Sequence, residues 1–189
     1  MNIKFGITGS ISSGKTTAGK IISKGTGPIF SADLAVNNLY KNYSFKKRLA
    51  KKFKIKVNSK FKKELKIKIL SKKGNLKMLE KMIHPLVRKK MFIFLKKNKE
   101  KKFIFFEIPL LIESKLMKHF DKIILIKANI NIRKKRYISK GGNSKLFTFL
   151  NSQQMKESQK TKFCDHVVVN NKSLNVLKKN LYNIIRRYE

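Results

Sequence analysis

The sequence has little cysteine, proline or glycine, and it has no long apolar run. Its 189 residues include one cysteine, Cys164, with three prolines and nine glycines. A single cysteine excludes an internal disulfide and fits a reducing cytoplasm. The longest apolar runs, such as 104–106 and 123–126, have the length of strands and are far too short for a membrane span. The first ten residues carry too few apolar side chains for a signal peptide, so we expect a cytoplasmic protein.

Acidic residues are also scarce, which leaves a formal net charge of +37 from 47 basic and 10 acidic side chains. Such a charge favours polyanionic partners, including nucleic acid. However, 41 of the basic residues are lysine and only 6 are arginine, whereas base-edge and bidentate phosphate recognition favours arginine. The lysines accompany an excess of Ile, Asn and Phe, all residues with AT-rich codons. Composition alone therefore leaves two interpretations of the high lysine content. It reflects either the compositional bias of a genome or a positive surface selected to bind a polyanion.

The order of apolar segments predicts an α/β fold. Short strands are expected at 2–8, 27–33, 102–111, 121–128 and 166–170, the second of them running into a loop. Helices are expected around 15–24, 129–139, 144–155 and 173–187. Strands that alternate with helices indicate a parallel sheet covered on both faces. An apolar fraction of 41%, with 14 phenylalanines, supplies enough material for one core in a single domain.

The stretch 41–102 is different, because it reads as helices only. Phe45, Leu49 and Phe53 are four residues apart, and the pairs Leu65/Ile69 and Leu79/Ile83 repeat that helical period. The stretch holds 23 of the 41 lysines, and residues 72–75 (KKGN) predict a turn. We therefore expect a helical insertion with one apolar stripe and a charged outer face between the second and third strands.

The segment GSISSGKT at 9–16 matches the phosphate-binding pattern G-x-x-x-x-G-K-[ST] without a mismatch. In such a loop successive backbone N–H groups surround phosphate oxygens, and the glycines relieve crowding where the chain turns. The helix that follows points its positive end at the phosphates. Lys15 is expected at the β/γ oxygens and Thr16 on Mg²⁺. ATP-binding residues predicted from this segment are Gly9, Ile11, Ser12, Ser13, Gly14, Lys15, Thr16 and Thr17.

Two carboxylates follow predicted strands and can be interpreted in two ways each. Asp33 lies past the second strand, where ligands bind in open parallel sheets, so it could accept a proton from an acceptor hydroxyl. It would serve equally well as the N-cap of a following helix. Glu107 ends the third strand, where it could hold the Mg²⁺ shell or be a charge that faces solvent.

The sequence resembles the dephospho-CoA kinases over nearly its whole length, from residue 3 to about 171. The resemblance is carried by FGITGSISSGKTTAGKII, IFSADLA, LEKMIHPLVRKKM, FFEIPLLIES, FDKIILI and FCDHVVVNN, in that order. It implies transfer of the ATP γ-phosphoryl group to the 3′-hydroxyl of the dephospho-CoA ribose, with Mg²⁺, as the last step of coenzyme A biosynthesis. It also implies a five-stranded parallel sheet of order 2-3-1-4-5. The core would cover about 1–40, 103–135 and 161–189, the acceptor-binding insertion about 41–102 and a small lid about 136–160.

Site residues implied by the resemblance match the family motifs position by position. Asp33 matches the second aspartate of D-A-D, the expected general base, whereas the first aspartate is Ser31 here. Arg136 matches the arginine of Q-x-x-R, which would contact the triphosphate, and Arg133 replaces the glutamine. Lys140 stands where a further arginine is frequent, Gln154 and Lys160 fit later lid positions, and Asn170 falls beside the adenine pocket. Acceptor contacts are expected from Asp33, His84, Arg88, Pro109, Leu110 and Glu113.

Several alternatives stay open at this stage. His84 on a lysine-rich helix also suits packing or capping, and Pro109, Leu110 and Leu111 suit packing. Ser10 and Ser12 occupy positions that are frequently glycine in the family. Another P-loop kinase of a nucleotide or nucleoside is the alternative enzyme, and a basic nucleic-acid-binding protein is the alternative class. We expect ATP and dephospho-CoA as substrates, a monomer, and neither a membrane nor nucleic acid as partner.

Overall fold

The computed structural model describes residues 2–72 and 74–189. It divides into two compact units, Met1–Ser31 with Asn98–Glu189, and Ala32–Lys97, which are described separately. The turn expected at 72–75 includes Lys73, which lies outside the described residues.

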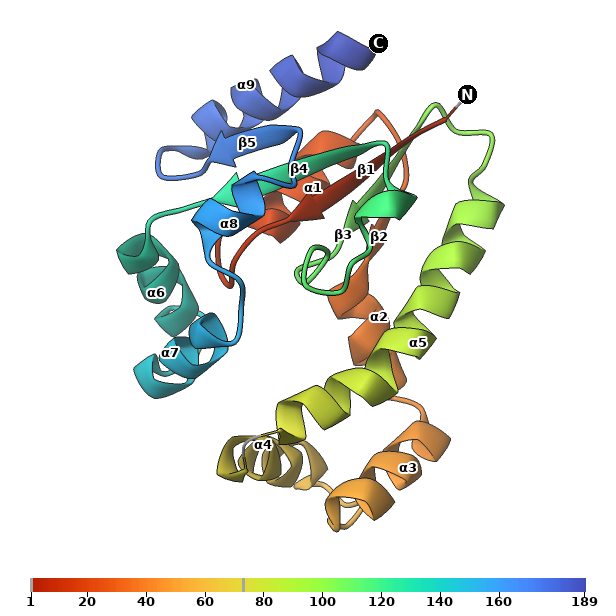
Figure 1. Cartoon of the computed structure of the whole chain (residues 1–189), viewed down its shortest axis with the longest axis vertical. Helices are drawn as coiled ribbons and strands as arrows, with labels where there is room; N and C mark the ends of the chain where they lie inside the picture. The colour runs from red at the N-terminus through yellow and green to blue at the C-terminus, as the bar shows by residue number, and fades with distance from the viewer. Residues whose placement is uncertain (1, 73) are drawn as a thin grey trace. The chain divides into compact units, whose positions relative to one another are not determined.

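The first unit is built on a five-stranded parallel sheet of order β2-β3-β1-β4-β5 (Figure 1), as expected from the resemblance. Its strands are β1 (Ile3–Thr8), β2 (Ile29–Ser31), β3 (Phe103–Glu107), β4 (Lys122–Lys127) and β5 (His166–Val169). The buried residues of β1, β3 and β4 are mainly apolar, which is the pattern of a parallel sheet with both faces covered. Its helices are α1 (Lys15–Ser23), α6 (Ile130–Ile138), α7 (Ser144–Ser152), α8 (Glu157–Thr161) and α9 (Leu174–Ile185), with short 3₁₀ turns η1 (Met117–His119) and η2 (Arg186–Tyr188).

Helices α1 and α9 pack on one face of this sheet. Alternate residues of β1 and β3, among them Phe5 and Phe105, join Ala18 and Ile22 of α1 in one core cluster with α9. On the opposite face Gly6 leaves room for Leu111 and Phe120, because a Cβ at Gly6 would overlap Leu111. The segment after β3 therefore covers the second face and is held there by packing.

The second unit is helical, as the sequence predicts. It comprises α2 (Ala32–Leu39), α3 (Tyr43–Phe53), α4 (Phe61–Ser71) and α5 (Asn75–Lys97). The predicted stripe residues Phe45, Leu49 and Phe53 are buried in one cluster with Leu65 and Ile83. The unit begins at residue 32, earlier than the expected 41, because α2 packs against α5.

Some predicted element boundaries are wrong. No loop separates β2 from the next element, because α2 starts at Ala32 directly after Ser31. Strand β3 ends at Glu107 rather than at 111, since the chain then turns over the sheet. The helix expected at 144–155 ends at Ser152, and α8 follows.

Helix α4 offers a matched test of the second unit's core. Leu65 is 3% exposed, whereas Leu70 on the same helix is 42% exposed. Leu65→Ala should lower the free energy of unfolding by about 3 kcal/mol, and Leu70→Ala by less than about 1 kcal/mol. Urea unfolding followed by circular dichroism measures both, and equal losses would contradict the assigned core face.

Candidate active site

The loop between β1 and α1 passes so close to its neighbours that two of its residues must be glycine. Gly9 has φ +150° and Gly14 has φ +100°. A Cβ at Gly9 would overlap the carbonyl oxygen of Ile126 at the end of β4, and a Cβ at Gly14 would overlap the Asn170 side chain after β5. The two glycines of the sequence pattern therefore have a steric cause. Ser12 also adopts the left-handed region, at φ +56°, which costs a non-glycine residue about 1–2 kcal/mol.

Three polar side chains of this loop, Ser10, Ser13 and Lys15, are buried. Lys15 is 7% exposed, and its Nζ donates to the Ser10 carbonyl oxygen at 2.9 Å. Ser13 is fully buried, and within the described residues its Oγ has no hydrogen-bond partner. A buried hydroxyl without a partner destabilises a protein by roughly 1–3 kcal/mol. A phosphate oxygen in the loop would supply the missing acceptor, so the residues present fit a nucleotide.

Thr16 and Glu107 meet at the carboxyl end of the sheet. The Thr16 Oγ1 donates to Glu107 Oε1 at 2.5 Å. Glu107 is 2% exposed and stands between Ile7 of β1 and Ser31 of β2 in the strand register. The alternative of a carboxylate that faces solvent is therefore wrong. A hydroxyl and a carboxylate side by side are oxygen ligands of the kind Mg²⁺ prefers.

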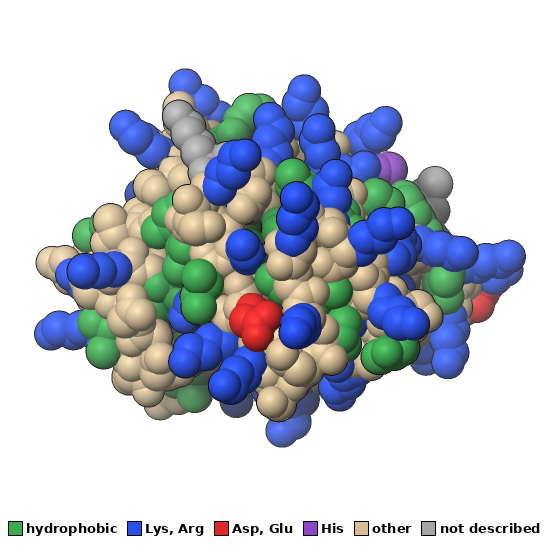
Figure 2. Space-filling model, turned by 90° about the horizontal axis from the view of Figure 1, so that it is seen from below, with side chains coloured by type: hydrophobic (Ala, Val, Ile, Leu, Met, Phe, Trp, Pro, Cys, Tyr) green, Lys and Arg blue, Asp and Glu red, His purple; other side chains and the backbone are tan. Residues whose placement is uncertain are grey.

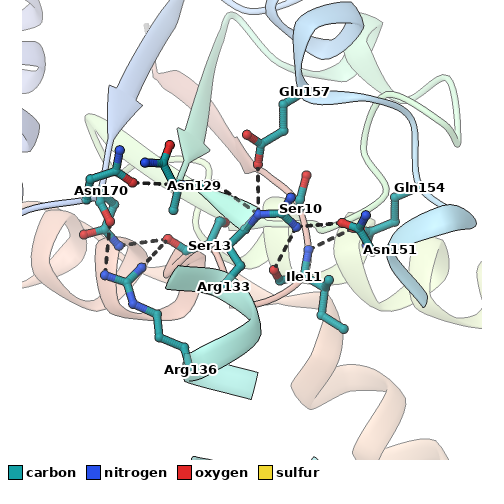
Figure 3. A network of polar contacts seen from close by, with 12 residues as sticks. Ser10, Ile11, Ser13, Asn129, Arg133, Arg136, Asn151, Gln154, Glu157 and Asn170 are labelled. Atoms are coloured by element: carbon teal, nitrogen blue, oxygen red, sulfur yellow. Dashed lines mark hydrogen bonds and ion pairs between the residues drawn. The ribbon is translucent and has the colours of Figure 1, made fainter. Parts of the chain in front are cut away.

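Arg136 of α6 and Asn170 after β5 both reach the loop carbonyl of Ser13 (Figure 3). Asn170 Nδ2 donates to the Ser13 oxygen at 2.8 Å, and Arg136 Nη1 donates to it at 3.4 Å. Arg136 Nη2 also donates to the Asn170 carbonyl oxygen at 3.0 Å. The structure thus brings two predicted ATP-binding residues together at the loop, whereas Lys140 is exposed in the turn after α6.

The predicted acceptor residues of the first unit follow β3. The Pro109 carbonyl accepts from Thr8 Oγ1 at 3.0 Å, and Leu110 is partly buried. Glu113 Oε1 is 2.7 Å from Lys160 Nζ and accepts from the Met155 N–H at 3.1 Å. Glu113 Oε2 is buried and has no hydrogen-bond partner in the described part of the chain, so it can accept one from a ligand.

Comparison with known proteins places this arrangement in a family. The family model for dephospho-CoA kinase matches residues 3–175. A dephospho-CoA kinase of Bartonella quintana is 33% identical over 186 residues, 96% of this chain and 95% of the relative. The chain belongs to the dephospho-CoA kinase family.

Solved structures agree on the fold. A crystal structure from Thermus thermophilus has a TM-score of 0.80 at 26% identity and covers 98% of this chain and 97% of that one. A dephospho-CoA kinase from Campylobacter jejuni has a TM-score of 0.66 at 22% identity, covering 100% and 98%. The family's P-loop kinase fold is therefore the fold of this chain.

The second unit carries the other residues expected from the family pattern. Asp33 is exposed in the first turn of α2, where the helix dipole favours a carboxylate. Its alternative role as N-cap is wrong, because the residue before the helix is Ser31. His84 is half-buried and Arg88 exposed, one turn apart on α5.

Four polar side chains that contact the loop or one another were not predicted as site residues. Gln154 Oε1 accepts from the Ile11 N–H at 2.8 Å, and Arg133 contacts Asn151 and Glu157. The match to the family motifs marked Gln154 as a lid position, and it marked Arg133 as a residue that replaces the usual glutamine. Nothing in the sequence marks Asn151 or Glu157, because their partners lie in other elements.

His84 should be neutral at neutral pH. Burial lowers the pKa of its imidazole from 6.5, and the charge of Arg88 lowers it further. The pKa of His84 is lower in the folded than in the unfolded protein. The contribution of His84 to the free energy of unfolding is therefore fully present above the unfolded-state pKa and is lost as the pH falls through the folded-state pKa.

An NMR titration tests this prediction. The imidazole resonance that disappears in His84→Gln should titrate below pH 6.5, and the variant should lose less stability on acidification. A midpoint at or above 6.5 would be the contradicting result.

Proposed function

We propose how the residues of this chain carry out the family's reaction. The chain transfers the γ-phosphoryl group of ATP to the 3′-hydroxyl of the dephospho-CoA ribose, the last step of coenzyme A biosynthesis. The observation that carries the proposal is the loop at 9–16, with its two sterically required glycines and its buried Lys15, in a chain of this family.

The loop binds the phosphates of ATP. Backbone N–H groups of the turn and the positive end of α1 face the anionic chain, and the Ser13 hydroxyl donates a hydrogen bond to a phosphate oxygen. The nucleotide-binding residues are Gly9, Ile11, Ser12, Ser13, Gly14, Lys15, Thr16, Thr17, Arg136, Lys140 and Asn170.

Thr16 and Glu107 hold Mg²⁺. The described residues contain no group of three or more His, Cys, Asp or Glu side chains that could bind a metal alone. Mg²⁺ characteristically takes one or two protein ligands together with substrate phosphates and water, so this small donor set suits it. When bound, Mg²⁺ neutralises charge on the β- and γ-phosphates.

Asp33 is the general base. Its carboxylate takes the proton of the 3′-hydroxyl as that oxygen bonds to the γ-phosphorus and the bond to the leaving ADP oxygen breaks. Lys15 and Arg136 stabilise the charge on the transferring group. These three residues are the catalytic set.

Each unit contributes its own acceptor contacts, the second unit from the helical insertion and the first unit from the segment after β3. A neutral His84 imidazole can donate or accept one hydrogen bond, Arg88 supplies a cation for the pyrophosphate, and Glu113 Oε2 accepts from a donor of the acceptor. Pro109 and Leu110 form an apolar wall. The lid at about 136–160 excludes water when it closes over ATP, which limits hydrolysis.

The surface charge does not require a nucleic-acid partner. Lysines and arginines are spread over the face in Figure 2 rather than gathered in one patch, and apolar side chains lie among them. A diffuse positive field attracts anionic substrates such as ATP and dephospho-CoA. Within the described residues no helix combines the length and apolarity that a bilayer crossing requires. We place the enzyme in the cytoplasm as a monomer.

Replacement of the base tests the mechanism. Asp33→Asn should lower kcat roughly 100-fold or more, because proton transfer is lost, and should leave the Kd for ATP within about twofold. A coupled assay of ADP release with ATP, Mg²⁺ and dephospho-CoA measures the rate. Asp121→Asn is the matched control, because its backbone partner Lys4 N can still donate to an amide oxygen. Normal turnover by Asp33→Asn would show that Asp33 is not the base.

Removal of the Glu107 charge tests the metal site. Glu107→Gln should raise the Mg²⁺ concentration for half-maximal activity about 10-fold or more, because a carboxylate that ligates or orients the ion is lost. Glu100→Gln, an exposed glutamate paired with Lys99, is the control. An unchanged Mg²⁺ dependence in Glu107→Gln would remove Glu107 from the site.

A further inference from the structure

Both backbone polar groups of Ile11, in the middle of the nucleotide loop, are held by side chains from distant segments. The Ile11 N–H donates to Gln154 Oε1 at 2.8 Å. The Ile11 carbonyl oxygen accepts from Arg133 Nη1 at 3.4 Å. The loop is therefore fixed on its outer side by residues that follow it by more than 120 positions, as Figure 3 shows.

Arg133 joins four segments through one side chain. It is 6% exposed. Its Nε donates to the Ala128 carbonyl oxygen after β4 at 3.0 Å, and its Nη1 donates to Asn151 Oδ1 in α7 at 2.7 Å. The Glu157 carboxylate of α8 lies 3.6 Å from Nε. The guanidinium also lies over the Phe147 ring, 5.9 Å from its centroid.

The contacts need an arginine. A guanidinium presents five N–H donors in a rigid planar fork, so it can serve three acceptors in different directions at once. A glutamine, which the family pattern has at this position, carries donors on one nitrogen only and no charge. Glu157 Oε1 has no hydrogen-bond partner among the described residues. The negative charge of this carboxylate is therefore balanced by the positive charge of Arg133.

We infer that Arg133 is a positioning residue for the nucleotide loop. It holds the Ile11 peptide in the orientation that the following N–H groups need and ties the lid residue Asn151 to the same point. A loop fixed before binding loses less freedom when ATP arrives, which raises affinity without any contact between Arg133 and ATP. The inference rests on the proposed binding of ATP by this loop.

The first arm of the test compares three single variants: Arg133→Gln, Asn151→Ala and the control Lys135→Gln. Arg133→Gln should raise KM for ATP about tenfold, the effect of losing one charge-assisted hydrogen bond, and leave KM for dephospho-CoA within twofold. Asn151→Ala should raise KM for ATP by a smaller factor. The double variant Arg133→Gln/Asn151→Ala should be no worse than Arg133→Gln, because both act through one contact. Lys135→Gln removes the same charge from an exposed site on α6 and should change neither KM.

The second arm separates positioning from stability. Arg133→Gln leaves Glu157 buried without its counter-charge and should lower the melting temperature of the nucleotide-free protein. Adding Glu157→Gln removes that unpaired charge and should restore the melting temperature while KM for ATP stays raised. Recovery of both quantities together, or a lower melting temperature with an unchanged KM for ATP, would show that Arg133 is only structural and overturn the inference.

Three further outcomes are decisive. If Arg133→Gln does not fold, the KM for ATP of Asn151→Ala is compared with that of the wild-type protein instead. An unchanged KM for ATP in Asn151→Ala then overturns the inference. If the wild-type protein shows no ATP-dependent thermal shift and no turnover, the proposed function fails, and the inference fails with it. Wild-type activity combined with a normal KM for ATP in Arg133→Gln rejects the positioning role alone.

Discussion

The site depends on how closely the nucleotide loop approaches the ends of β4 and β5. Gly9 lies against the Ile126 carbonyl and Gly14 against the Asn170 side chain, so neither position has room for a Cβ. That approach sets where α1 begins and so where its N-terminal N–H groups point. Lys15 and Thr16 are in the first turn of this helix, and their side chains reach Ser10 and Glu107. The two glycine positions of the sequence pattern are the consequence of this steric constraint.

Two ion pairs with buried cations link α8 to other segments of the first unit. Lys160 is fully buried, which for a lysine requires a partner, and Glu113 supplies one at 2.7 Å. Arg133 and Glu157 form a second buried pair close to the loop. Removing one partner of such a pair leaves a charge in a low-dielectric site and costs more than losing the pair as a whole. Through Arg133, the segment from α7 to α8 depends on a residue that also contacts the loop.

Much of this was predictable from the sequence, because it depends on local pattern. The apolar strands and the period of Phe45, Leu49 and Phe53 mark their own elements, and the loop pattern carries its own geometry. The start of α2 was missed because the short strand β2 runs into a helix with no turn residue between them. The burial of Glu107 was left open, since it depends on flanking strands that are distant in the sequence. The contact between Arg133 and Ile11 was out of reach for the same reason, as it joins residues 122 positions apart.

The few acidic residues show how a chain with a net charge of +37 keeps a defined site. Lysine is tolerated wherever a side chain is solvated, because its charge stays in water there. An added lysine cannot replace a carboxylate that balances a buried cation or accepts a hydrogen bond from a backbone N–H. Four of the first unit's acids stand at such positions: Glu113 on Lys160, Glu157 on Arg133, and Asp121 and Asp165 on the N–H groups of Lys4 and Ile123. Glu107 instead accepts a hydrogen bond from the Thr16 hydroxyl. Apart from buried cations such as Lys15, Arg133 and Lys160, the abundant positive charge lies on the solvated surface, where it attracts anions without selecting among them. Selection between substrates must come from the few fixed groups of the site.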